Sequence, residues 1–379
     1  MPHVALVTTS YPDGTPGADA AGSFVEDFAV ELSHAARVTV IAASRQDSIE
    51  SNGTLCVRRF RVPRLPLSLL KPQNPLDWPA LVSTLRNGRR ALRHVIETEP
   101  VDHVLAMWVL PCGWWAAQEA QPRGIPFSTW ALGSDIWSLG RIPLVRNILA
   151  TVLKNAAYRF ADGIALCEDV ERLCNKPCEF LASVRALPEV REVAVAEMPP
   201  YKLAYVGRWH PNKGIDLLLD ALQNLEEDDW QRISEIRIFG GGPLDENVRD
   251  LTGKLAAAGR PVTVGGYLDK EQAASLIAWA DYLLIPSRIE SIPVIFSDAM
   301  QMSTPVISSP VGDLPSLLEK YRCGVLADSC SAQAYGDAIR TALRGNASAF
   351  CRGVEVARQD FSPANSVLQF STKTALATT

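Results

Sequence analysis

The sequence predicts an α/β protein made of two doubly wound parallel-sheet domains. Short apolar runs alternate with longer amphipathic stretches along most of the chain, as strands and helices do in repeated βα units. A proline-rich segment at 187–201 interrupts this alternation and separates two such series. The length of 379 residues is typical of two domains or three.

The composition is that of an ordinary soluble protein, and it narrows the classes of function. Hydrophobic residues make up 47% of the chain and charged residues 21%, enough for well-packed cores. The net charge of −5 argues against a nucleic-acid binder, which normally carries a basic surface. Since the opening residues lack the charged start of a signal peptide and no apolar run could span a bilayer, we expect a cytoplasmic protein.

The cysteines predict neither a disulfide framework nor a metal site. Eight of them are scattered over the chain, unlike those of a small secreted domain. Cys167, Cys174 and Cys178 form the one cluster, but their spacing matches no zinc pattern, and we interpret them as buried structural thiols. We therefore expect reduced thiols, no bound metal ion and no other cofactor.

The first domain opens with a βαβ pattern. Apolar runs predict strands at His3–Thr9, Val38–Ala42, Cys56–Val62, Val104–Trp108, Phe127–Trp130 and Gly163–Leu166. Amphipathic stretches predict helices at Ala21–His34, Trp78–Thr98, Gly113–Gln121 and Pro143–Phe160. This order is typical of a parallel sheet with helices on both faces.

A second βα series follows the proline-rich segment. Predicted strands lie at Leu203–Val206, Ile236–Phe239, Val262–Val264, Asp281–Ile285 and Pro305–Ser309. Predicted helices lie at Ile215–Leu225, Leu244–Ala258 and Lys270–Ala280, and another begins near Pro293. We place the domains at 1–188 and 189–361, and the last segment, 362–379, either packs back on the first domain or frays. Domains of this kind bind ligands beyond the carboxyl ends of their strands.

One strand–loop–helix–strand unit, 281–312, carries the clearest signal for a binding site. We expect the helix of this unit to begin near Pro293, because the fixed φ of proline suits a first helical turn. Glu290, in the preceding loop, therefore lies just before the helix. Backbone amides at such an N-terminus bind anions such as phosphate. Glu290, together with Asp298 further along the helix, could accept hydrogen bonds from ligand hydroxyls. A phosphate joined to sugars satisfies both requirements.

Two cations follow the first strand of the second domain. Arg208 and Lys213 flank a short turn that leads into a helix near Gly214, at the carboxyl edge of the predicted sheet. They could hold a phosphate there, and they could neutralise a diphosphate without Mg²⁺. Equally, they could be solvated surface cations, the usual situation of lysine and arginine. The motif alone leaves both interpretations open.

Glycine-rich turns end the next two strands. The turn at 240–242 is followed by Pro243 and allows the backbone to approach a ligand closely, but it matches neither a dinucleotide fingerprint nor a Walker loop. The turn at 265–267, Gly-Gly-Tyr, could present backbone groups to a nucleobase. Many turns of this type are glycine-rich for steric reasons alone.

Taken in order, these motifs resemble a known family. The chain carries G-R-x4-K-G, F-G-x-G-P, V-G-G-Y, P-S-R-x-E-S-x-P-V-x3-D-A-M and T-P-V-I-S-S-x-V-G in sequence between residues 205 and 312. This ordered set resembles the retaining glycosyltransferases of the GT-B fold, in particular glycosyltransferase family 4. The likeness is looser at 8–40 and 102–136. It implies two Rossmann-like domains facing across a cleft, with a nucleotide-sugar bound mostly by the second.

The resemblance implies a role for each matching residue. Arg208 and Lys213 would hold the diphosphate, and Glu290 would bind hydroxyls of the donor sugar. Asp298 stands where the family has a second glutamate that binds ribose, and it is one methylene shorter. The other donor-binding positions are Gly207, Gly241, Gly242, Gly266, Tyr267, Ser291, Ile292, Pro293 and Val294.

In the first domain the resemblance points to two places. Gly22 best matches the family's glycine turn, which faces the donor phosphates and the acceptor, although Ala21 replaces a second glycine. In the segment TWALGSDIW, Leu132 replaces the family's usual histidine. Leucine can neither bind the sugar nor move a proton, so that role would fall to Asp135, to another side chain or to none.

The acceptor side is indicated by a basic and apolar region, 57–94. Its cations are opposed within that interval only by Asp77, and they are Arg58, Arg59, Arg61, Arg64, Lys71, Arg86, Arg89, Arg90 and Arg93. Such a segment suits the surface of an anionic membrane, where each cation contributes about 1 kcal/mol. A solvated helix face is the alternative. Because many relatives act on lipid-linked acceptors at the inner leaflet, the resemblance favours peripheral contact.

Together with these motifs, the resemblance implies a metal-independent, retaining hexosyltransferase that uses a nucleotide-sugar and a cell-envelope glycan or lipid-linked acceptor. Two alternatives remain. A non-hydrolytic nucleotide-sugar epimerase can share the architecture but needs acid and base groups and no acceptor. A catalytically inactive nucleotide-binding partner subunit would account for Leu132 and Asp298.

Overall fold

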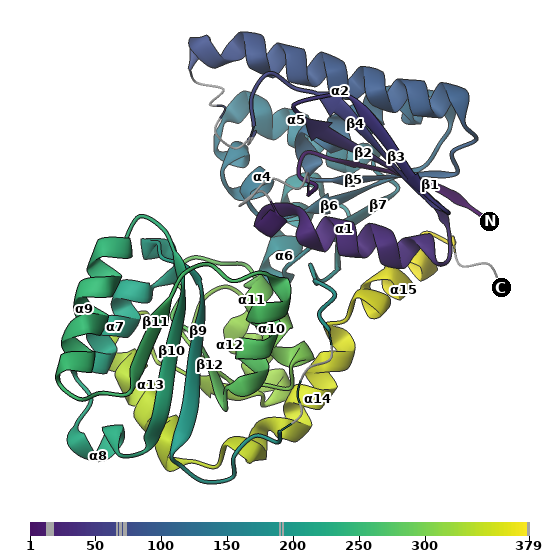
Figure 1. Ribbon diagram of the computed structural model, residues 1–379. Coiled ribbons are helices and arrows are strands. Elements are labelled where there is room, and N and C mark those ends of the chain that lie inside the picture. The colour runs from purple at the N-terminus through teal and green to yellow at the C-terminus, as the bar shows by residue number, and fades with distance from the viewer. Residues whose placement is uncertain are drawn as a thin grey trace. The chain divides into compact units, whose positions relative to one another are not determined.

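The computed structural model describes residues 1–12, 19–65, 67, 70, 74–188, 191 and 193–376. The chain forms two compact units, residues 1–184 with 363–379 (unit 1) and residues 185–362 (unit 2). The sequence analysis placed these divisions after residues 188 and 361. Each unit contains one largely parallel sheet, so the predicted class of two parallel-sheet α/β domains is confirmed (Figure 1).

Unit 1 is built on an eight-stranded sheet with the order β3-β4-β2-β1-β5-β6-β7-β8. Its strands are β1 (His3–Thr8), β2 (Arg37–Ser44), β3 (Ser48–Asn52), β4 (Leu55–Arg61), β5 (His103–Met107), β6 (Phe127–Ala131), β7 (Tyr158–Ala161) and β8 (Glu179–Phe180). All neighbours are parallel except β3, an edge strand that pairs antiparallel with β4 and was not predicted.

The predicted strand at Gly163–Leu166 is wrong. That stretch begins α6 (Ile164–Cys174), and the strand lies earlier, at Tyr158–Ala161, where a helix end was predicted. The preceding helix, α5 (Pro143–Asn155), ends well before Phe160. The strand has only four residues and directly follows the helix, so its apolar positions merged with the helical pattern.

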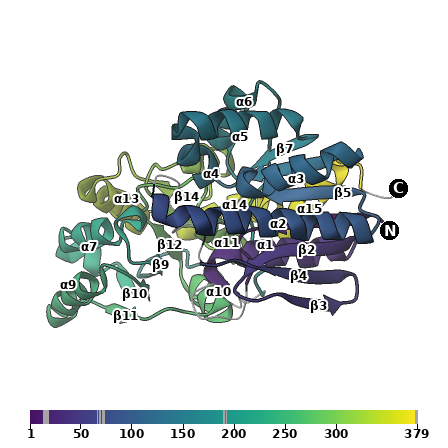
Figure 2. The same ribbon diagram turned by 90° about the horizontal axis from the view of Figure 1, so that it is seen from above.

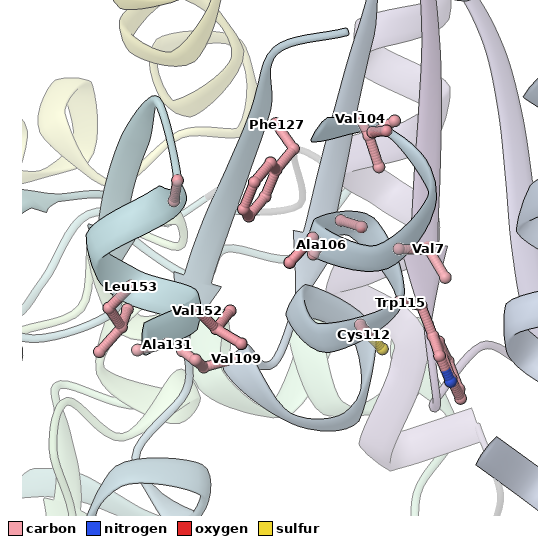
Figure 3. Close-up of a cluster of buried hydrophobic side chains, with 14 of the residues drawn as sticks. Val7, Val104, Ala106, Val109, Cys112, Trp115, Phe127, Ala131, Val152 and Leu153 are labelled. Carbon is pink, nitrogen blue, oxygen red and sulfur yellow. The ribbon is translucent and has the colours of Figure 1, made fainter. Parts of the chain in front are cut away.

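Helices cover both faces of the unit 1 sheet (Figures 1 and 2). Alternate residues of β1 face opposite ways: Val4 and Leu6 pack in the cluster that contains α1 (Asp19–Ser33), and Ala5 and Val7 pack in the other. The second cluster contains side chains from α2 (Trp78–Thr98), α3 (Trp114–Glu119), α5 and α6. Figure 3 shows its centre, with Trp115 and Phe127 among the buried side chains. A short helix, α4 (Ser134–Trp137), follows β6.

The C-terminal helix α15 (Pro363–Lys373) packs on unit 1 beside α1. Phe370 is fully buried, with its ring centroid 5.7 Å from that of Phe28 and 5.8 Å from that of His103. Ser366 Oγ donates to the backbone carbonyl of Ala182 at 3.0 Å. Of the two possibilities left open for this segment, the structure therefore supports packing on the first domain.

Unit 2 is built on a six-stranded parallel sheet with the order β11-β10-β9-β12-β13-β14. Its strands are β9 (Tyr201–Arg208), β10 (Ile233–Gly241), β11 (Val262–Gly265), β12 (Tyr282–Ile285), β13 (Val306–Ser308) and β14 (Gly324–Leu326). The strand order reverses between β9 and β12. Loops leaving these two strands diverge there and create the crevice in which such sheets bind ligands.

Helices connect the successive strands of unit 2, and two more follow its last strand. They are α7 (Ile215–Gln223), α8 (Glu227–Trp230), α9 (Asp245–Ala257), α10 (Lys270–Trp279), α11 (Val294–Gln301), α12 (Leu314–Tyr321), α13 (Ala332–Arg344) and α14 (Cys351–Asp360). The sequence analysis did not predict β14 or α12–α14. Within the described part of the chain, no helix is long and apolar enough to cross a bilayer.

Candidate functional site

Two charged pairs join the loops that follow β9 and β12, at the strand-order reversal of unit 2. The ammonium group of Lys213 donates a hydrogen bond to the carboxylate of Glu290. Arg288 forms a two-pronged pair with Asp216, with Nη1–Oδ1 at 2.7 Å and Nη2–Oδ2 at 2.9 Å. Burial alone would raise the pKa of Asp216, but the hydrogen bonds and charge of Arg288 lower it. Lys213 and Glu290, far apart in sequence, are thus brought together.

The backbone of these two loops is in direct contact. The Arg288 amide donates to the carbonyl of Asn212 at 2.8 Å, and the Arg288 guanidinium donates to Pro211 O at 2.7 Å. Gly214 has a φ of +67°, and a Cβ there would lie 1.8 Å from the carbonyl oxygen of Pro286. Only glycine fits, so this residue sets the distance between the Lys213 and Glu290 loops.

The N-terminus of α11 lies beside this pair and has no side-chain cap. Pro293 occupies the N-cap position and supplies no hydrogen-bonding side chain to the first amides of the helix, which include that of Val294. The hydroxyls of Ser291 and Ser309 are buried and have no hydrogen-bond partner among the described residues. A helix N-terminus without a side-chain cap and unpartnered hydroxyls of this kind suit a phosphate or a polyhydroxyl ligand.

Gly312 shapes the same loop from the other side. Its φ is +54°, and a Cβ there would lie 2.0 Å from the carbonyl oxygen of Ser291. That carbonyl accepts a hydrogen bond from the amide of Asp313 at 3.1 Å. Ser291 and Ile292 are consequently held against the start of the α12 segment, directly before Pro293.

Arg208 ends β9 and is exposed. No ion pair of its guanidinium is found among the described residues, so its charge is available for a ligand. Gly207 precedes it, and a Cβ at Gly207 would lie 3.2 Å from the hydroxyl of Tyr205. Because Arg208 is the last residue of β9, it lies at the carboxyl edge of the sheet, on the strand next to β12.

The glycine turns after β10 and β11 contact each other and the β9 loop. Tyr267 donates its hydroxyl to the carbonyl of Gly241 at 2.7 Å, and a Cβ at Gly241 would overlap the Tyr267 ring at 2.6 Å. Gly242 lies close to Trp209, whose carbonyl would be 2.6 Å from an added Cβ. Gly266 is exposed and has no neighbour around such a Cβ. Packing alone explains Gly241 and Gly242, whereas Gly266 is open to a ligand.

Asp298 is fully buried within α11 and paired with Arg185. Arg185 Nε donates to Oδ1 of Asp298 at 3.3 Å, and Nη2 donates to Oδ2. The sequence analysis missed Arg185 because it lies in the segment between the two series of strands, far from every motif. The expected ribose contact of Asp298 stays a prediction, and the observed partner of its carboxylate is a guanidinium.

In unit 1, Asp135 is buried at the start of α4. Its carboxylate accepts hydrogen bonds from the amides of Val109 at 2.7 Å and Leu132 at 3.2 Å, which ties together the loops after β5 and β6. Burial raises the pKa of Asp135 to about 6, against the lowering effect of these hydrogen bonds. A carboxyl group with this pKa can exchange a proton near neutral pH. Its hydrogen bonds to two loops are those of a residue that stabilises the fold.

Gly22 lies in α1, where the helix meets the end of the β1 loop. A Cβ at this position would be 2.9 Å from the Cα of Tyr11 and 3.1 Å from the carbonyl carbon of Ser10. The close approach of helix and loop therefore requires glycine for packing. Its expected contact with donor phosphates stays a prediction, and Ala21 lies outside the residues whose side chains are described.

The basic region 57–94 is less positive than its sequence suggested. Glu119 binds Arg93, with Nη2–Oε1 at 2.8 Å, and also binds Arg89. The hydrogen bond from Arg93, helped by Arg89, lowers the pKa of Glu119 to about 2. Further pairs join Arg58 to Glu99 at 2.8 Å, Arg59 to Glu50 at 3.5 Å and Arg64 to Asp77 at 3.4 Å.

Within the interval itself Asp77 is the only carboxylate, but carboxylates from other parts of the chain also pair with these cations. Glu50, Glu99 and Glu119 lie outside 57–94 in sequence but reach the region in space. Arg86 and Arg90 are exposed on α2, and Lys71 lies outside the described residues. In the described part of the chain, no three or more histidine, cysteine, aspartate or glutamate side chains are grouped so that they could hold a metal ion.

Comparison with known proteins finds a family match in the part of the chain that contains the Lys213–Glu290 pair. Residues 200–345 match the family described as "Glycosyl transferases group 1". A D-inositol 3-phosphate glycosyltransferase of Corynebacterium efficiens is 33% identical over 187 residues, which span 47% of this chain and 43% of that protein. The chain thus matches less than half the length of this curated relative.

Solved structures share the whole fold at low identity. The sucrose-phosphate synthase from Thermosynechococcus elongatus superposes with a TM-score of 0.71 at 18% identity, covering 98% of each chain. HepE from Anabaena, solved in complex with UDP and glucose, gives a TM-score of 0.67 at 15% identity and covers 100% of each chain. The structure therefore has the two-domain GT-B fold of glycosyltransferases, as the resemblance implied.

Proposed function

We propose that this chain is a retaining glycosyltransferase of family 4 that transfers a hexose-type sugar from a nucleotide-sugar donor to an acceptor hydroxyl. One observation carries the proposal: the Lys213–Glu290 pair lies at the strand-order reversal of unit 2, beside the uncapped N-terminus of α11. This is the part of the chain that matches group 1 glycosyl transferases.

The pair offers the two kinds of contact that a nucleotide-sugar needs. Lys213, exposed Arg208 and the first amides of α11 would bind the diphosphate, and Glu290 would accept hydrogen bonds from the sugar hydroxyls. In the absence of ligand the two charges neutralise each other. A diphosphate would replace the carboxylate as the partner of Lys213 and leave Glu290 free for the sugar.

The reaction exchanges one C–O bond for another. The bond from the anomeric carbon to the diphosphate breaks as the bond to the acceptor oxygen forms, and the proton of the acceptor passes to the departing phosphate. Positive charge develops on the sugar and negative charge on the leaving group, which the cations and helix amides stabilise. This route needs no histidine at Leu132 and no metal ion, because arginine and lysine neutralise the diphosphate.

The acceptor is proposed from the chemistry of unit 1. Trp78 and Val82 are exposed on α2, followed one and two turns later by the exposed Arg86 and Arg90. An apolar start followed by cations suits the surface of an anionic membrane. We therefore place the enzyme in the cytoplasm, in peripheral contact with the inner leaflet, acting on a lipid-linked or cell-envelope glycan.

A transfer assay tests this function. The protein is incubated with UDP-, GDP- or ADP-sugars and with glycolipid or glycan acceptors, and the anomeric configuration of the product is read by NMR. We expect a product that requires an acceptor and keeps the configuration of the donor. Conversion of the donor without any acceptor would identify an epimerase instead.

A catalytically inactive nucleotide-binding subunit is the second candidate, favoured by Leu132 and by the buried position of Asp298. Leu132 lacks the ring nitrogens of the family's histidine, and the carboxylate of Asp298 is paired with Arg185. Binding of a nucleoside diphosphate without turnover over a broad acceptor panel would select this alternative.

A further inference from the structure

The described residues that open unit 2, 185–188 and 191, are hydrogen-bonded to α11 and the residue after it at several points. The side chain of Gln301 donates to Arg185 O at 2.8 Å and accepts from the amide of Leu187 at 3.4 Å. Arg191 Nε donates to the carbonyl of Met302, just after the helix, at 2.9 Å. With the Arg185–Asp298 pair, these bonds fix the C-terminal half of α11 to this segment.

The Asp298 carboxylate is closed to a ligand. Its side chain has 0% of its surface exposed, whereas that of Arg185 retains 18%. Both carboxylate oxygens accept hydrogen bonds from the guanidinium. Aspartate is one methylene shorter than glutamate, so its charge stays close to the helix and within reach of Arg185. A ribose hydroxyl cannot approach without displacing this pair.

We propose that Arg185 and Asp298 form a positioning pair for α11, and that Asp298 does not touch the ribose of the nucleotide. This inference rests on the proposed function, because α11 presents its N-terminal amides and the preceding Glu290 to the donor. The pair holds the helix from its buried side. It thereby sets where these amides and the Glu290 loop stand relative to Lys213 on the neighbouring loop.

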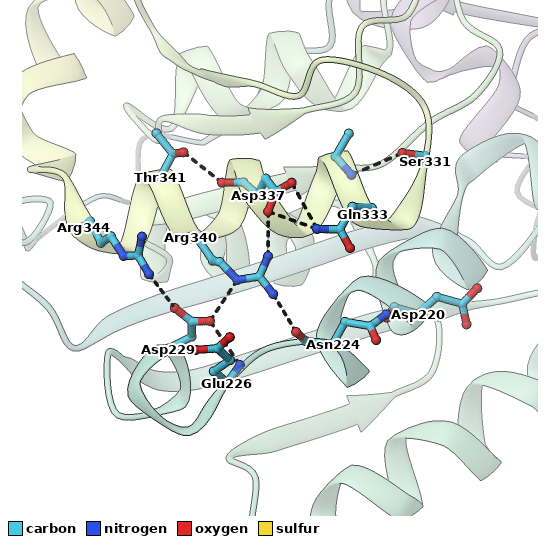
Figure 4. Close-up of polar contacts among 11 residues, drawn as sticks. Asp220, Asn224, Glu226, Asp229, Ser331, Gln333, Asp337, Arg340, Thr341 and Arg344 are labelled. Atoms are coloured by element: carbon cyan, nitrogen blue, oxygen red, sulfur yellow. Dashed lines mark hydrogen bonds and ion pairs between the residues drawn. The ribbon is translucent and has the colours of Figure 1, made fainter.

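A second buried pair in unit 2 provides a matched control (Figure 4). Arg340 Nε donates to Oδ2 of Asp229 at 3.1 Å, and the side chains are 18% and 3% exposed, much like Arg185 and Asp298. Asp229 belongs to α8, which precedes β10 and so lies at the amino edge of the sheet, opposite the site. Breaking this pair removes an equally buried interaction but leaves α11 untouched.

The first experiment measures whether Asp298 recognises ribose. Dissociation constants of the 379-residue chain are determined for UDP, GDP and ADP, and then for the 2′,3′-dideoxy form of the nucleotide that binds most tightly. We expect Asp298→Asn and Arg185→Gln each to weaken both forms by the same factor, about tenfold, because misplacing α11 affects the phosphates. The double variant should lose no more than either single variant, and Asp229→Asn should bind as the wild type does.

A different pattern would overturn the inference. If Asp298→Asn weakens the natural nucleotide at least tenfold more than the dideoxy form, the carboxylate contacts the ribose. If Asp298→Asn and Arg185→Gln bind both forms as tightly as the wild type, the pair does not position α11.

A second measurement keeps the inference testable even if no nucleotide binds, which would count against the proposed function alone. Backbone hydrogen exchange of α11 is compared in the wild type, Arg185→Gln and Asp229→Asn. The inference requires faster exchange in α11 in Arg185→Gln and unchanged exchange there in Asp229→Asn. Equal exchange of α11 in all three proteins would refute the positioning role independently of any ligand.

Discussion

The ammonium group of Lys213 and the carboxylate of Glu290, 77 residues apart in the chain, form an ion pair across the strand-order reversal of unit 2. Their side chains are 38% and 16% exposed, so the pair is open to solvent on one side. A partly exposed pair adds little to stability, about 1 kcal/mol or less. Its position next to the uncapped N-terminus of α11 is therefore better explained by binding than by folding.

Removing either member of this pair should abolish most turnover and leave the fold intact. For Lys213→Ala and Glu290→Ala we expect about 100-fold slower transfer, since each variant removes a group that stabilises the leaving diphosphate or orients the sugar. The melting temperature should hardly change. Initial rates and thermal unfolding measure the two effects.

Lys254→Ala is the control for these variants. Lys254 pairs with Asp250 on the outer surface of α9, with both side chains mostly exposed. Its transfer rate should equal that of the wild type. Near-normal turnover of both Lys213→Ala and Glu290→Ala would contradict the assignment of the site.

Gly214 should be intolerant of any side chain. In Gly214→Ala the new Cβ would lie 1.8 Å from Pro286 O and the residue would keep a φ of +67°, so the loops after β9 and β12 must separate. We expect a loss of stability of about 2 kcal/mol or more, measured by denaturant unfolding. Gly253→Ala, in the middle of α9 with open space around the Cβ, should instead be neutral or stabilising. Equal stability of the two variants would contradict the close contact.

The residues of the proposed donor site could be selected from the sequence because they lie in local motifs. Glu290, Pro293 and Lys213 each lie at a strand end or helix start, positions that turn chemistry and periodicity identify. The partners that join these motifs were not predictable in this way. Arg185 reaches Asp298 across 113 residues, and Arg288 reaches Asp216 across 72. Such pairings depend on the fold and leave no local pattern.

The same limit explains the errors in unit 1. The four-residue strand Tyr158–Ala161 was merged with the preceding helix, because its few apolar positions fit both periods. The basic region 57–94 was judged by the charges within its own interval, while its neutralising carboxylates come from Glu50, Glu99 and Glu119. Long-range electrostatics cannot be read from neighbouring residues alone.

Asp135 should make stability depend on pH. Its pKa in the folded state is raised from 3.8 to about 6 by burial, so the folded protein binds more protons than the unfolded chain between these values. The free energy of unfolding should therefore fall as pH rises through this window, by the share that Asp135 contributes. In Asp135→Asn, the part of this pH dependence that is due to Asp135 should be absent when the free energy of unfolding is measured with denaturant between pH 4 and 7. An unchanged pH dependence in the variant would contradict the assignment.

The exposed stripe of α2, formed by Trp78, Val82, Arg86 and Arg90, should bind anionic vesicles. Each surface arginine contributes about 1 kcal/mol near such a membrane, so loss of Arg86 and Arg90 should weaken binding by about thirtyfold. Co-sedimentation with phosphatidylserine-containing vesicles measures this for Arg86→Ser/Arg90→Ser. Arg172→Ser, an exposed arginine on α6, is the control. If the wild type fails to sediment with anionic vesicles, peripheral contact through this stripe is excluded.

The most direct test of the central claim is a thermal-shift measurement of the 379-residue chain and its Lys213→Ala variant with UDP, GDP, ADP and their sugars. A ligand present at about 100 times its Kd adds about 2.7 kcal/mol of stability. We expect one nucleotide series to raise the melting temperature of the wild type and to have little effect on Lys213→Ala. No shift of the wild type with any of these nucleotides, or an equal shift of both proteins, would contradict a nucleotide-sugar site at the Lys213–Glu290 pair.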